Sequence, residues 1–141
     1  MKFATALFAD RKKWYRTSDF GYRKNPMNTK KIQWHNGTDY GCYGKKEMLY
    51  APEAGTVTVS KKTKNRGNWI KVHFPSTGRK WSMYHLSERL VKKGQKVKAG
   101  QPLGKVGTTG LSTGVHLHLG CQKIGKTKFL DPHAYNYTVP K

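Results

Sequence analysis

The feature that most constrains the fold of this chain is a series of short apolar runs separated by glycine and proline. Four such runs lie in the middle of the chain, at residues 49–52, 55–59, 69–74 and 81–86. Runs of this length with turn residues between them are typical of antiparallel β-strands. In the third run, alternation predicts that Ile70, Val72 and Phe74 point to one face, the core face. We therefore predict a mainly β fold, with an antiparallel sheet as its core and short helices or loops at its periphery.

Composition supports one compact β domain. The chain has 141 residues, of which 12% are aromatic and 15 are glycine, and this argues against both disorder and a helical bundle. The longest apolar stretch, residues 3–9, is far shorter than the roughly 18 residues that a membrane-spanning helix needs. It also makes an unconvincing signal peptide, because charged residues follow it directly. We expect a domain over residues 18–141, preceded by an N-terminal extension or edge element at residues 1–17.

The net charge of the chain is extreme. With 28 Lys and Arg against 7 Asp and Glu, the formal charge is +21. A charge of this size indicates an anionic partner, such as nucleic acid, lipopolysaccharide, teichoic acid or acidic lipid. The basic residues are spread along the whole chain. This distribution favours a general electrostatic coat over an element that reads a nucleic-acid sequence.

A glycine-spaced segment lies at residues 91–107, with glycines at 94, 100, 104 and 107 and lysines between them. We interpret it as tight turns around short strands, with the lysines facing solvent. The pattern is similar to the hybrid motif of biotinyl and lipoyl carrier domains. The segment lacks a modifiable lysine with the flanking residues that those carriers need, so the similarity bears on the fold alone.

Two groupings of histidine carry the candidate chemistry. His35 and Asp39 lie four residues apart with a glycine between them, a spacing that lets a strand and a turn bring both onto one centre. His116 and His118 lie two apart in a strand-like run, so alternation projects both imidazoles from one face. Either grouping alone is a weak signal. Together they offer three or four nitrogen and oxygen ligands of the type that zinc prefers in an open catalytic site.

Several motifs occur in an order that resembles one enzyme family. They are Ser-Asp-Phe-Gly-Tyr-Arg at residues 18–23, His-Asn-Gly-Thr-Asp at 35–39, Tyr-Ala-Pro at 50–52, Gly-Thr-Val at 55–57, Tyr-His-Leu-Ser at 84–87, the glycine-spaced segment at 91–107, Thr-Gly-Leu-Ser-Thr-Gly-Val-His-Leu-His at 109–118 and Asp-Pro at 131–132. In content and order, over about residues 18–135, they resemble the lysostaphin and LytM type of zinc metalloendopeptidase.

The resemblance implies that His35, Asp39 and His118 bind one zinc ion, and that His85 and His116 are catalytic histidines. It also implies a fold of the duplicated hybrid-motif type and a substrate among the peptide bonds of bacterial peptidoglycan. Some relatives have lost ligands and act only as activators or scaffolds. This chain keeps all five positions, so we expect an active enzyme. The tyrosine that is proposed to assist the oxyanion in the family has no clear counterpart here.

The base in this chemistry is expected to be an imidazole. Amide hydrolysis needs an activated water, a group that takes its proton and a group that stabilises the developing oxyanion. None of the three glutamates of the chain lies beside a ligand motif. His116 is best placed as the base because it lies two residues from His118, and His85 would orient water or stabilise the intermediate. The sequence leaves open which of His85 and His116 takes the proton.

Other residues near these motifs are expected to have smaller roles. His73 is either a structural histidine or a contact of the site, and His133 is expected in a turn. Trp34 either forms the floor of the cleft or belongs to the core. Cys42 and Cys121 each follow a ligand position by three residues, so alternation turns them away from the metal. We expect both to be free thiols, although a bridge between them is an alternative.

The leading hypothesis is a phage endolysin that cuts peptidoglycan cross-links between D-alanine and meso-diaminopimelate. It would be made in the host cytoplasm and would reach the wall on lysis, without a signal peptide. A single catalytic domain without a separate wall-binding domain, with its charge of +21, favours this hypothesis and a Gram-negative host. Alternatives are a bacteriocin or autolysin that cuts glycine bridges, and a nonenzymatic basic polymer-binding relative. We expect a monomer that binds peptidoglycan and anionic envelope polymers, either lipopolysaccharide or teichoic acid, and no specific nucleic acid.

Overall fold

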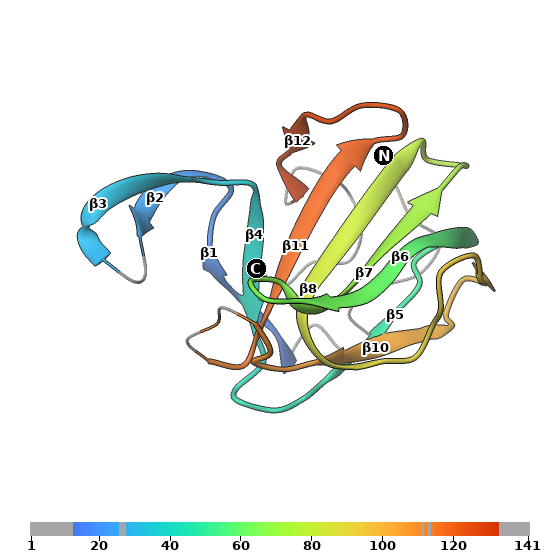
Figure 1. The fold of residues 1–141 in the computed structure, drawn as a ribbon, viewed down its shortest axis with the longest axis horizontal. Coiled ribbons are helices and arrows are strands. Elements are labelled where there is room, and N and C mark those ends of the chain that lie inside the picture. Colours follow the sequence, from blue (N-terminus) through green and yellow to red (C-terminus); the bar gives the residue numbers. More distant parts are fainter. Residues whose placement is uncertain (1–12, 26–27, 111, 113, 133–141) are drawn as a thin grey trace.

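A ten-stranded antiparallel sheet organises the chain in the computed structural model, which describes residues 13–25, 28–110, 112 and 114–132 (Figure 1). Its central path runs β1-β4-β11-β8-β7-β6-β9, while β10 pairs with β5 and β8, and β12 pairs with β11. A separate two-stranded sheet is formed by β2 and β3. The strands are β1 (Tyr15–Ser18), β2 (Gly21–Asn25), β3 (Asn28–His35), β4 (Gly37–Gly41), β5 (Met48–Tyr50), β6 (Gly55–Thr63), β7 (Gly67–Phe74), β8 (Arg79–Arg89), β9 (Lys96–Val97), β10 (Pro102–Val106), β11 (His116–Lys123) and β12 (Phe129–Leu130).

The predicted mainly β, antiparallel fold is confirmed. Loops and turns join the strands, and no helix occurs in the part of the chain that the structure describes. Of the short helices or loops expected at the periphery, only loops are found there. No helix long and apolar enough to cross a membrane was found among these residues. Two turns of the glycine-spaced segment contain Gly94 and Gly100 with φ of 89° and 84°, a conformation that favours glycine.

The core lies on one face of the central strands. Ile70, Val72 and Phe74 of β7 are fully buried, as their alternation predicts. On β11, Leu117 and Leu119 are buried in the same cluster. The neighbouring strands contribute further buried side chains to it, among them Trp81, Met83, Tyr40 and Val57. Because side chains alternate along a strand, the residues between these positions lie on the opposite face of the sheet.

That opposite face carries the candidate site. Asp39 of β4 pairs directly with His118 of β11, and His118 pairs in turn with Tyr84 of β8. Three strands that are distant in the sequence therefore place functional side chains on adjacent positions of one surface. His116 lies two residues before His118 on β11 and faces the same cavity, as the sequence predicts.

The β2–β3 hairpin projects from the body of the molecule and continues into the large sheet (Figure 1). His35 ends β3, and Gly37 begins β4, so a single residue, Asn36, joins the two sheets. His35 and Asp39 lie on either side of this bend. The edge strand β1 pairs with β4 and spans the predicted boundary at residue 18.

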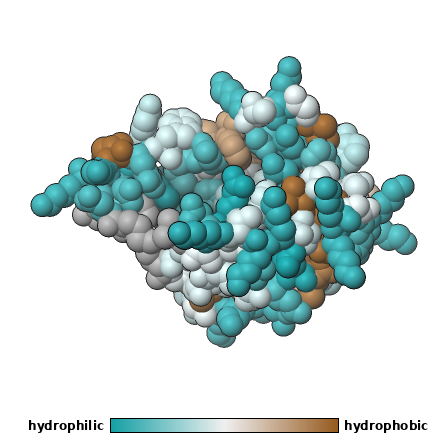
Figure 2. Space-filling view, in the orientation of Figure 1, coloured by the Kyte–Doolittle hydropathy of each residue, from teal (hydrophilic) through white to brown (hydrophobic). Residues whose placement is uncertain are grey.

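Polar and charged side chains dominate the face of the molecule seen in Figure 2. Figure 2 shows hydrophilic residues over most of the visible face, with only small separate hydrophobic areas between them. This distribution is consistent with a formal charge of +21 spread along the whole sequence.

Candidate metal centre

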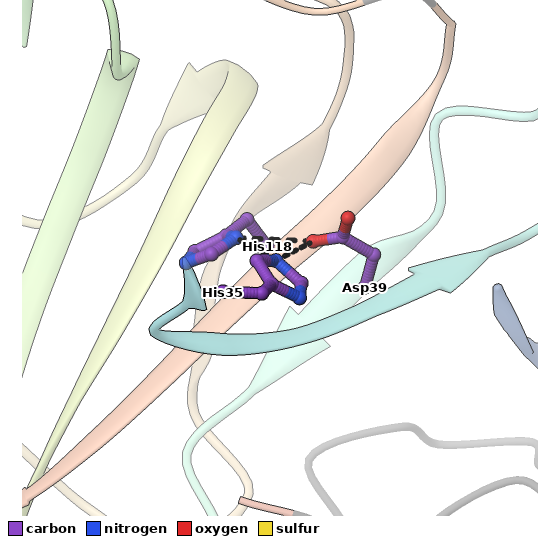
Figure 3. A group of neighbouring side chains, drawn as sticks. All are labelled: His35, Asp39 and His118. Carbon is purple, nitrogen blue, oxygen red and sulfur yellow. Dashed lines mark hydrogen bonds and ion pairs between the residues drawn. The ribbon is translucent and has the colours of Figure 1, made fainter. Parts of the chain in front are cut away.

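Three donor atoms converge at the bend between the two sheets. His35 Nε2 lies 3.0 Å from His118 Nδ1 and 3.2 Å from Asp39 Oδ1, and the latter two atoms are 3.0 Å apart. Figure 3 shows the three side chains pointing toward one another from β3, β4 and β11. They form a group of ligand-type residues that could hold a metal ion.

The separations fit a small tetrahedral cation. Ligands held at about 2.0–2.1 Å from zinc in a tetrahedron lie roughly 3.3 Å from one another, close to the spacing found here. Two imidazole nitrogens and one carboxylate oxygen are also a donor set that zinc takes in catalytic sites, with a fourth position for water or substrate. The residues present therefore fit a zinc ion.

Backbone contacts hold His35 in the orientation that ligation needs. The Nδ1–H of His35 donates to the Asp19 carbonyl oxygen at 2.8 Å. This bond fixes the tautomer, so that the lone pair of Nε2 faces the centre. The ring is only 3% exposed, which leaves it little freedom to rotate away.

Asp39 is held through its second oxygen. Arg23 Nη1 lies 2.8 Å from Asp39 Oδ2 and 2.7 Å from Ser18 Oγ, so the guanidinium joins the carboxylate to the β1 strand. Oδ1 remains directed at the two imidazoles. Arg23 comes from β2 of the hairpin, which means that the hairpin contributes a support as well as the ligand His35.

The charges of the centre are strongly coupled. Burial alone would raise the pKa of Asp39, yet the close contacts of its carboxylate with the His118 and His35 imidazoles outweigh burial and hold that pKa well below its ordinary value. For His118, burial is the largest cause and lowers its pKa, although the neighbouring Asp39 opposes this effect. Metal ligation requires an ionised carboxylate, and the low pKa of Asp39 keeps it in that state.

A cavity of about 670 Å³ opens beside the three ligands. Asp39, His118, His85 and His116 all line it. One wall is formed by the hairpin with Arg23, Lys24, Asn25 and Gln33, and the other by the loop before β11 with Ser112, Gly114 and Val115. The cavity therefore brings together all the catalytic candidates of the sequence and two of the three ligand candidates.

His85 reaches the cavity from a β-bulge. In the pairing of β7 with β8, Asn68 faces Leu86 and Ile70 faces Met83, so Tyr84 and His85 together oppose a single residue. His85 has a φ of 65°, which is unusual for a residue other than glycine and is accommodated by the bulge. Irregular backbone of this kind re-aims side chains, and here it turns His85 toward the metal ligands.

Both histidines that are candidates for proton transfer are anchored through Nδ1. His85 Nδ1–H donates to the Thr109 carbonyl oxygen at 2.8 Å, and His116 Nδ1–H donates to the Gly114 carbonyl oxygen at 2.9 Å. Ser112 Oγ lies a further 3.1 Å from the same atom of His116. These bonds leave the Nε2 lone pairs for the cavity. The two ring centroids are 5.0 Å apart, close enough for both to act on one reacting group.

Burial controls the ionisation of His85. Its ring is 8% exposed, and desolvation lowers its pKa to about 4, which the hydrogen bond to Thr109 only partly opposes. His85 is therefore neutral at pH 7 and can accept a proton.

The structure corrects the expectation for Trp34. It belongs neither to the cavity nor to the core, because it is 49% exposed on the hairpin and packs edge-on against Phe20 and Tyr22. His73 was expected to be either a structural histidine or a contact of the site. It lies beside Lys71 and Lys80 and does not line the cavity, so it makes no contact with the site. His133 lies outside the described residues.

Both cysteines are free and buried, as the first alternative for them predicts. Neither belongs to the group of metal-ligand candidates in the described chain. In the core cluster, Cys121 and Cys42 pack with apolar side chains. Burial raises the pKa of the Cys121 thiol to about 12, so this group remains protonated.

Sequence reasoning missed the supports of the centre. It identified neither the contact of Arg23 with Asp39 nor that of Thr109 with His85. Arg23 is the last residue of the motif at residues 18–23, and its place in that motif was the available signal. A carbonyl such as that of Thr109 has no signal in the sequence, because every residue carries one.

A two-histidine, one-aspartate centre beside a cavity with two further histidines defines a candidate metallohydrolase. The chain matches Peptidase family M23 over residues 33–132 and belongs to this family. It is also 38% identical over 107 residues to the peptidoglycan DD-endopeptidase ShyA of Vibrio cholerae. That match covers 75% of this chain and 24% of ShyA, so the chain spans about a quarter of the length of this relative.

Solved structures share the fold. A zinc-containing peptidase from Vibrio cholerae has a TM-score of 0.76 and 32% identity, covering 99% of this chain and 41% of that one. The catalytic domain of lysostaphin from Staphylococcus simulans has a TM-score of 0.76 and 25% identity, covering 88% and 92%. A mutant catalytic domain of the prophage-encoded M23 protein EnpA from Enterococcus faecalis has a TM-score of 0.74 and 28% identity, covering 94% and 97%. The lysostaphin-like fold predicted from the sequence is confirmed.

Proposed function

We propose that the protein is a zinc-dependent endopeptidase that hydrolyses peptide cross-links of bacterial peptidoglycan. The observation that carries this proposal is the convergence of His35 Nε2, Asp39 Oδ1 and His118 Nδ1 within 3.2 Å of one another at the edge of a cavity. The zinc content of the Vibrio cholerae peptidase supports the choice of metal. The name of ShyA supports the choice of substrate.

Each residue has a defined task in this reaction. His35, Asp39 and His118 would hold the zinc, which when bound supplies Lewis-acid chemistry to a carbonyl and lowers the pKa of a water. His85 and His116 present Nε2 to the same cavity, where the pair takes the proton from the attacking water and returns it to the leaving amine. The imidazole that takes the proton thereby gains an N–H at Nε2, which donates a hydrogen bond to the developing oxyanion until the proton passes to the leaving amine.

The bond proposed to be cut joins D-alanine to meso-diaminopimelate. Support comes from ShyA, a DD-endopeptidase that is 38% identical, whereas lysostaphin is 25% identical. Lys24 lines one wall of the cavity beside Arg23, whose charge is paired with Asp39, and the Lys24 ammonium suits substrates with free carboxylates. Glycine bridges carry no such groups and remain the alternative substrate.

We also propose that this activity belongs to a phage endolysin, which resides in the host cytoplasm until lysis and then acts on the wall. The likeness to the prophage-encoded EnpA supports a phage origin. The charge of +21 supports attraction to an anionic envelope, whether its polymer is lipopolysaccharide or teichoic acid. Expression of the chain inside Gram-negative cells, with and without permeabilisation of the inner membrane, tests this role. Lysis that needs permeabilisation is expected.

Separate variants of ligands and catalysts test the assignment of the centre. His35→Ala and His118→Ala should lose both bound zinc and hydrolysis of sacculi, since each removes a donor atom. His116→Ala and His85→Asn should keep near-normal zinc content and lose about 10² or more in rate. Elemental analysis of the purified variants, alongside initial rates, distinguishes the groups. Full zinc occupancy and turnover in His118→Ala would overturn the assignment.

Digestion of defined substrates tests the bond. Directly cross-linked Gram-negative sacculi and pentaglycine-bridged staphylococcal wall are each incubated with the zinc-loaded protein, and the products are analysed by mass spectrometry. Release of monomeric stem peptides from the first substrate is expected. Cutting confined to the glycine bridges would exclude the proposed bond.

A further inference from the structure

Four basic side chains lie close together on the outer face of the sheet, three from β6, β7 and β8 and one from the turn between β6 and β7. We call Lys61, Arg66, Lys71 and Lys80 the basic strip. Three of them surround the ring of Trp69. The Nζ atoms of Lys61 and Lys71 lie 5.7 and 5.8 Å from its centroid, and the guanidinium carbon of Arg66 lies 4.7 Å from it. Lys80 lies on the same face, where it pairs across the strands with His73.

The charges of the basic strip are not neutralised within the described chain. None of its four cations lies within ion-pair distance of a carboxylate there. Burial is the largest cause that lowers the pKa of Lys71, and the nearby positive charges of Lys80 and Arg66 lower it further. The aromatic face beneath them attracts cations but carries no net charge. An arrangement of this kind costs stability until an anion binds to it.

The basic strip is continuous with the metal centre. Trp69 packs edge-on against Tyr84 with 5.4 Å between centroids, and Tyr84 stacks on His118 at 4.8 Å with an interplanar angle of 6°. The guanidinium of Arg66 also lies over the Tyr84 ring, 5.3 Å from its centroid. The residues of the strip do not line the cavity of the centre. It therefore extends the active face of the sheet beyond the cavity.

We propose that the basic strip binds free carboxylates of the substrate polymer at stem peptides next to the one being cut. This inference rests on the proposed function, because it assumes that peptidoglycan lies across the same face. Adjacent strands are about 4.8 Å apart, so Lys61, Lys71 and Lys80 on three neighbouring strands form a row that several carboxylates of one polymer can contact together. The Arg66 guanidinium, ordered over two rings, has the planar fork that pairs with a carboxylate.

Two triple variants with the same net charge test the proposal. Lys61→Gln/Lys71→Gln/Lys80→Gln removes three charges from the strip, and Lys92→Gln/Lys93→Gln/Lys126→Gln removes three from exposed sites elsewhere. Both are made in the His116→Ala background so that purified sacculi are digested too slowly to affect the binding measurement. Co-sedimentation with sacculi then measures affinity, and thermal unfolding with zinc analysis verifies the fold. Arg66 is left intact because it contacts Tyr84.

The strip variant is expected to bind sacculi roughly fivefold or more weakly than the control variant. On sacculi whose carboxylates have been amidated, the two variants should bind alike. Equal losses on native sacculi would mean that only net charge matters, and would overturn the proposal. A difference that persists after amidation, or that occurs with duplex DNA or lipopolysaccharide vesicles and not with sacculi, would also overturn it, since the anion would then be a phosphate.

Wild-type digestion separates this proposal from the proposed function. If the wild-type protein fails to digest sacculi, the proposed function is wrong, whatever the binding data show. If it digests them and the two triple variants bind equally, the function stands and the inference about the basic strip fails.

Discussion

The two carboxylate oxygens of Asp39 have different contacts and different roles. Oδ1 faces the two imidazoles, while Oδ2 is occupied by Arg23 at 2.8 Å. An oxygen already engaged in a charged hydrogen bond is a poor second ligand, so Arg23 directs Asp39 to offer one donor atom. This leaves a coordination position for water or substrate, which an open catalytic site requires.

Removal of Arg23 should therefore weaken the metal site. Arg23→Gln is expected to reduce zinc affinity about 10- to 100-fold, the usual effect of losing a contact that orients a ligand. Competition with a chelator of known affinity measures this change. Lys30→Gln is the control, because it removes one exposed positive charge from the same hairpin without a contact to Asp39. Equal affinities for the two variants would show that Arg23 acts only through its charge.

The ionisation of His85 should make stability depend on pH. Its pKa is about 4 in the folded protein, against about 6.5 when unfolded, so between these values the unfolded state binds the extra proton. The unfolding free energy should therefore fall as the pH decreases from about 6.5 to 4. The contribution of this one group is at most about 3 kcal/mol.

Urea denaturation across this pH range tests the effect, with His85→Asn as the comparison. Asparagine does not titrate and tolerates the φ of 65° at this position, so the backbone should be retained. The variant should show a shallower pH dependence than the wild type. Parallel curves would mean that His85 is not desolvated in the folded protein.

At the scale of residues, local patterns grouped the candidate ligands but did not indicate their supports. Spacing joined His35 to Asp39 and alternation joined His116 to His118, and the family resemblance then separated ligands from catalytic histidines. Arg23 contacts Asp39 across 16 positions, because the β2–β3 hairpin folds back over the centre. A periodic pattern in the sequence cannot predict a long-range contact of this kind.

Among the elements, the pairing of β4 with β11 sets the distance between ligands. Asp39 is directly opposite His118, and two positions away Gly37 is opposite Gly120. A Cβ atom built on Gly37 would lie 2.2 Å from the Leu119 carbonyl oxygen and 2.8 Å from His118 Nε2. Only glycine at this position lets β4 approach β11 closely enough to form the centre.

Gly37→Ala should push the two strands apart. We expect a loss of roughly 1–3 kcal/mol in unfolding free energy, together with reduced zinc content, because Asp39 moves with β4. Gly114→Ala is the matched control, since a Cβ there meets nothing within 4 Å. Chemical denaturation and metal analysis of both variants provide the test. Wild-type values for Gly37→Ala would show that the strands can shift without affecting the centre.

The elements themselves could be predicted better than their arrangement. Apolar alternation was sufficient for strands such as β7, whose inward residues are all buried. The bulge that turns His85 into the cavity could not be predicted, because it depends on the pairing of β8 with β7 and then with β10. Trp34 was misplaced for a different reason: alternation along β3 turns it to the face opposite Gln33, which lines the cavity, so proximity to His35 in the sequence does not bring Trp34 there.

For the whole molecule, charge is the dominant property. The 7 Asp and Glu residues cannot neutralise 28 Lys and Arg residues, so a positive potential surrounds the protein. Beyond the close contacts proposed for the basic strip, this potential should attract the protein to any anionic envelope from a distance. Attraction of this kind is screened by salt, with a Debye length of about 8 Å at physiological ionic strength.

Salt should therefore slow the approach to the wall more than it slows the hydrolysis step. Hydrolysis of intact sacculi is expected to slow steeply as salt is raised from low to above-physiological concentrations, because approach to the wall depends on the charge of +21. Hydrolysis of a small uncharged cross-link peptide should change little, since the contacts of the buried ligands are shielded from bulk ions. The measurement compares initial rates on both substrates across one salt series, with zinc content checked at each end. If both rates fell in parallel, the charge would act on the fold or on the hydrolysis step itself, and attraction to the envelope would not explain the salt dependence.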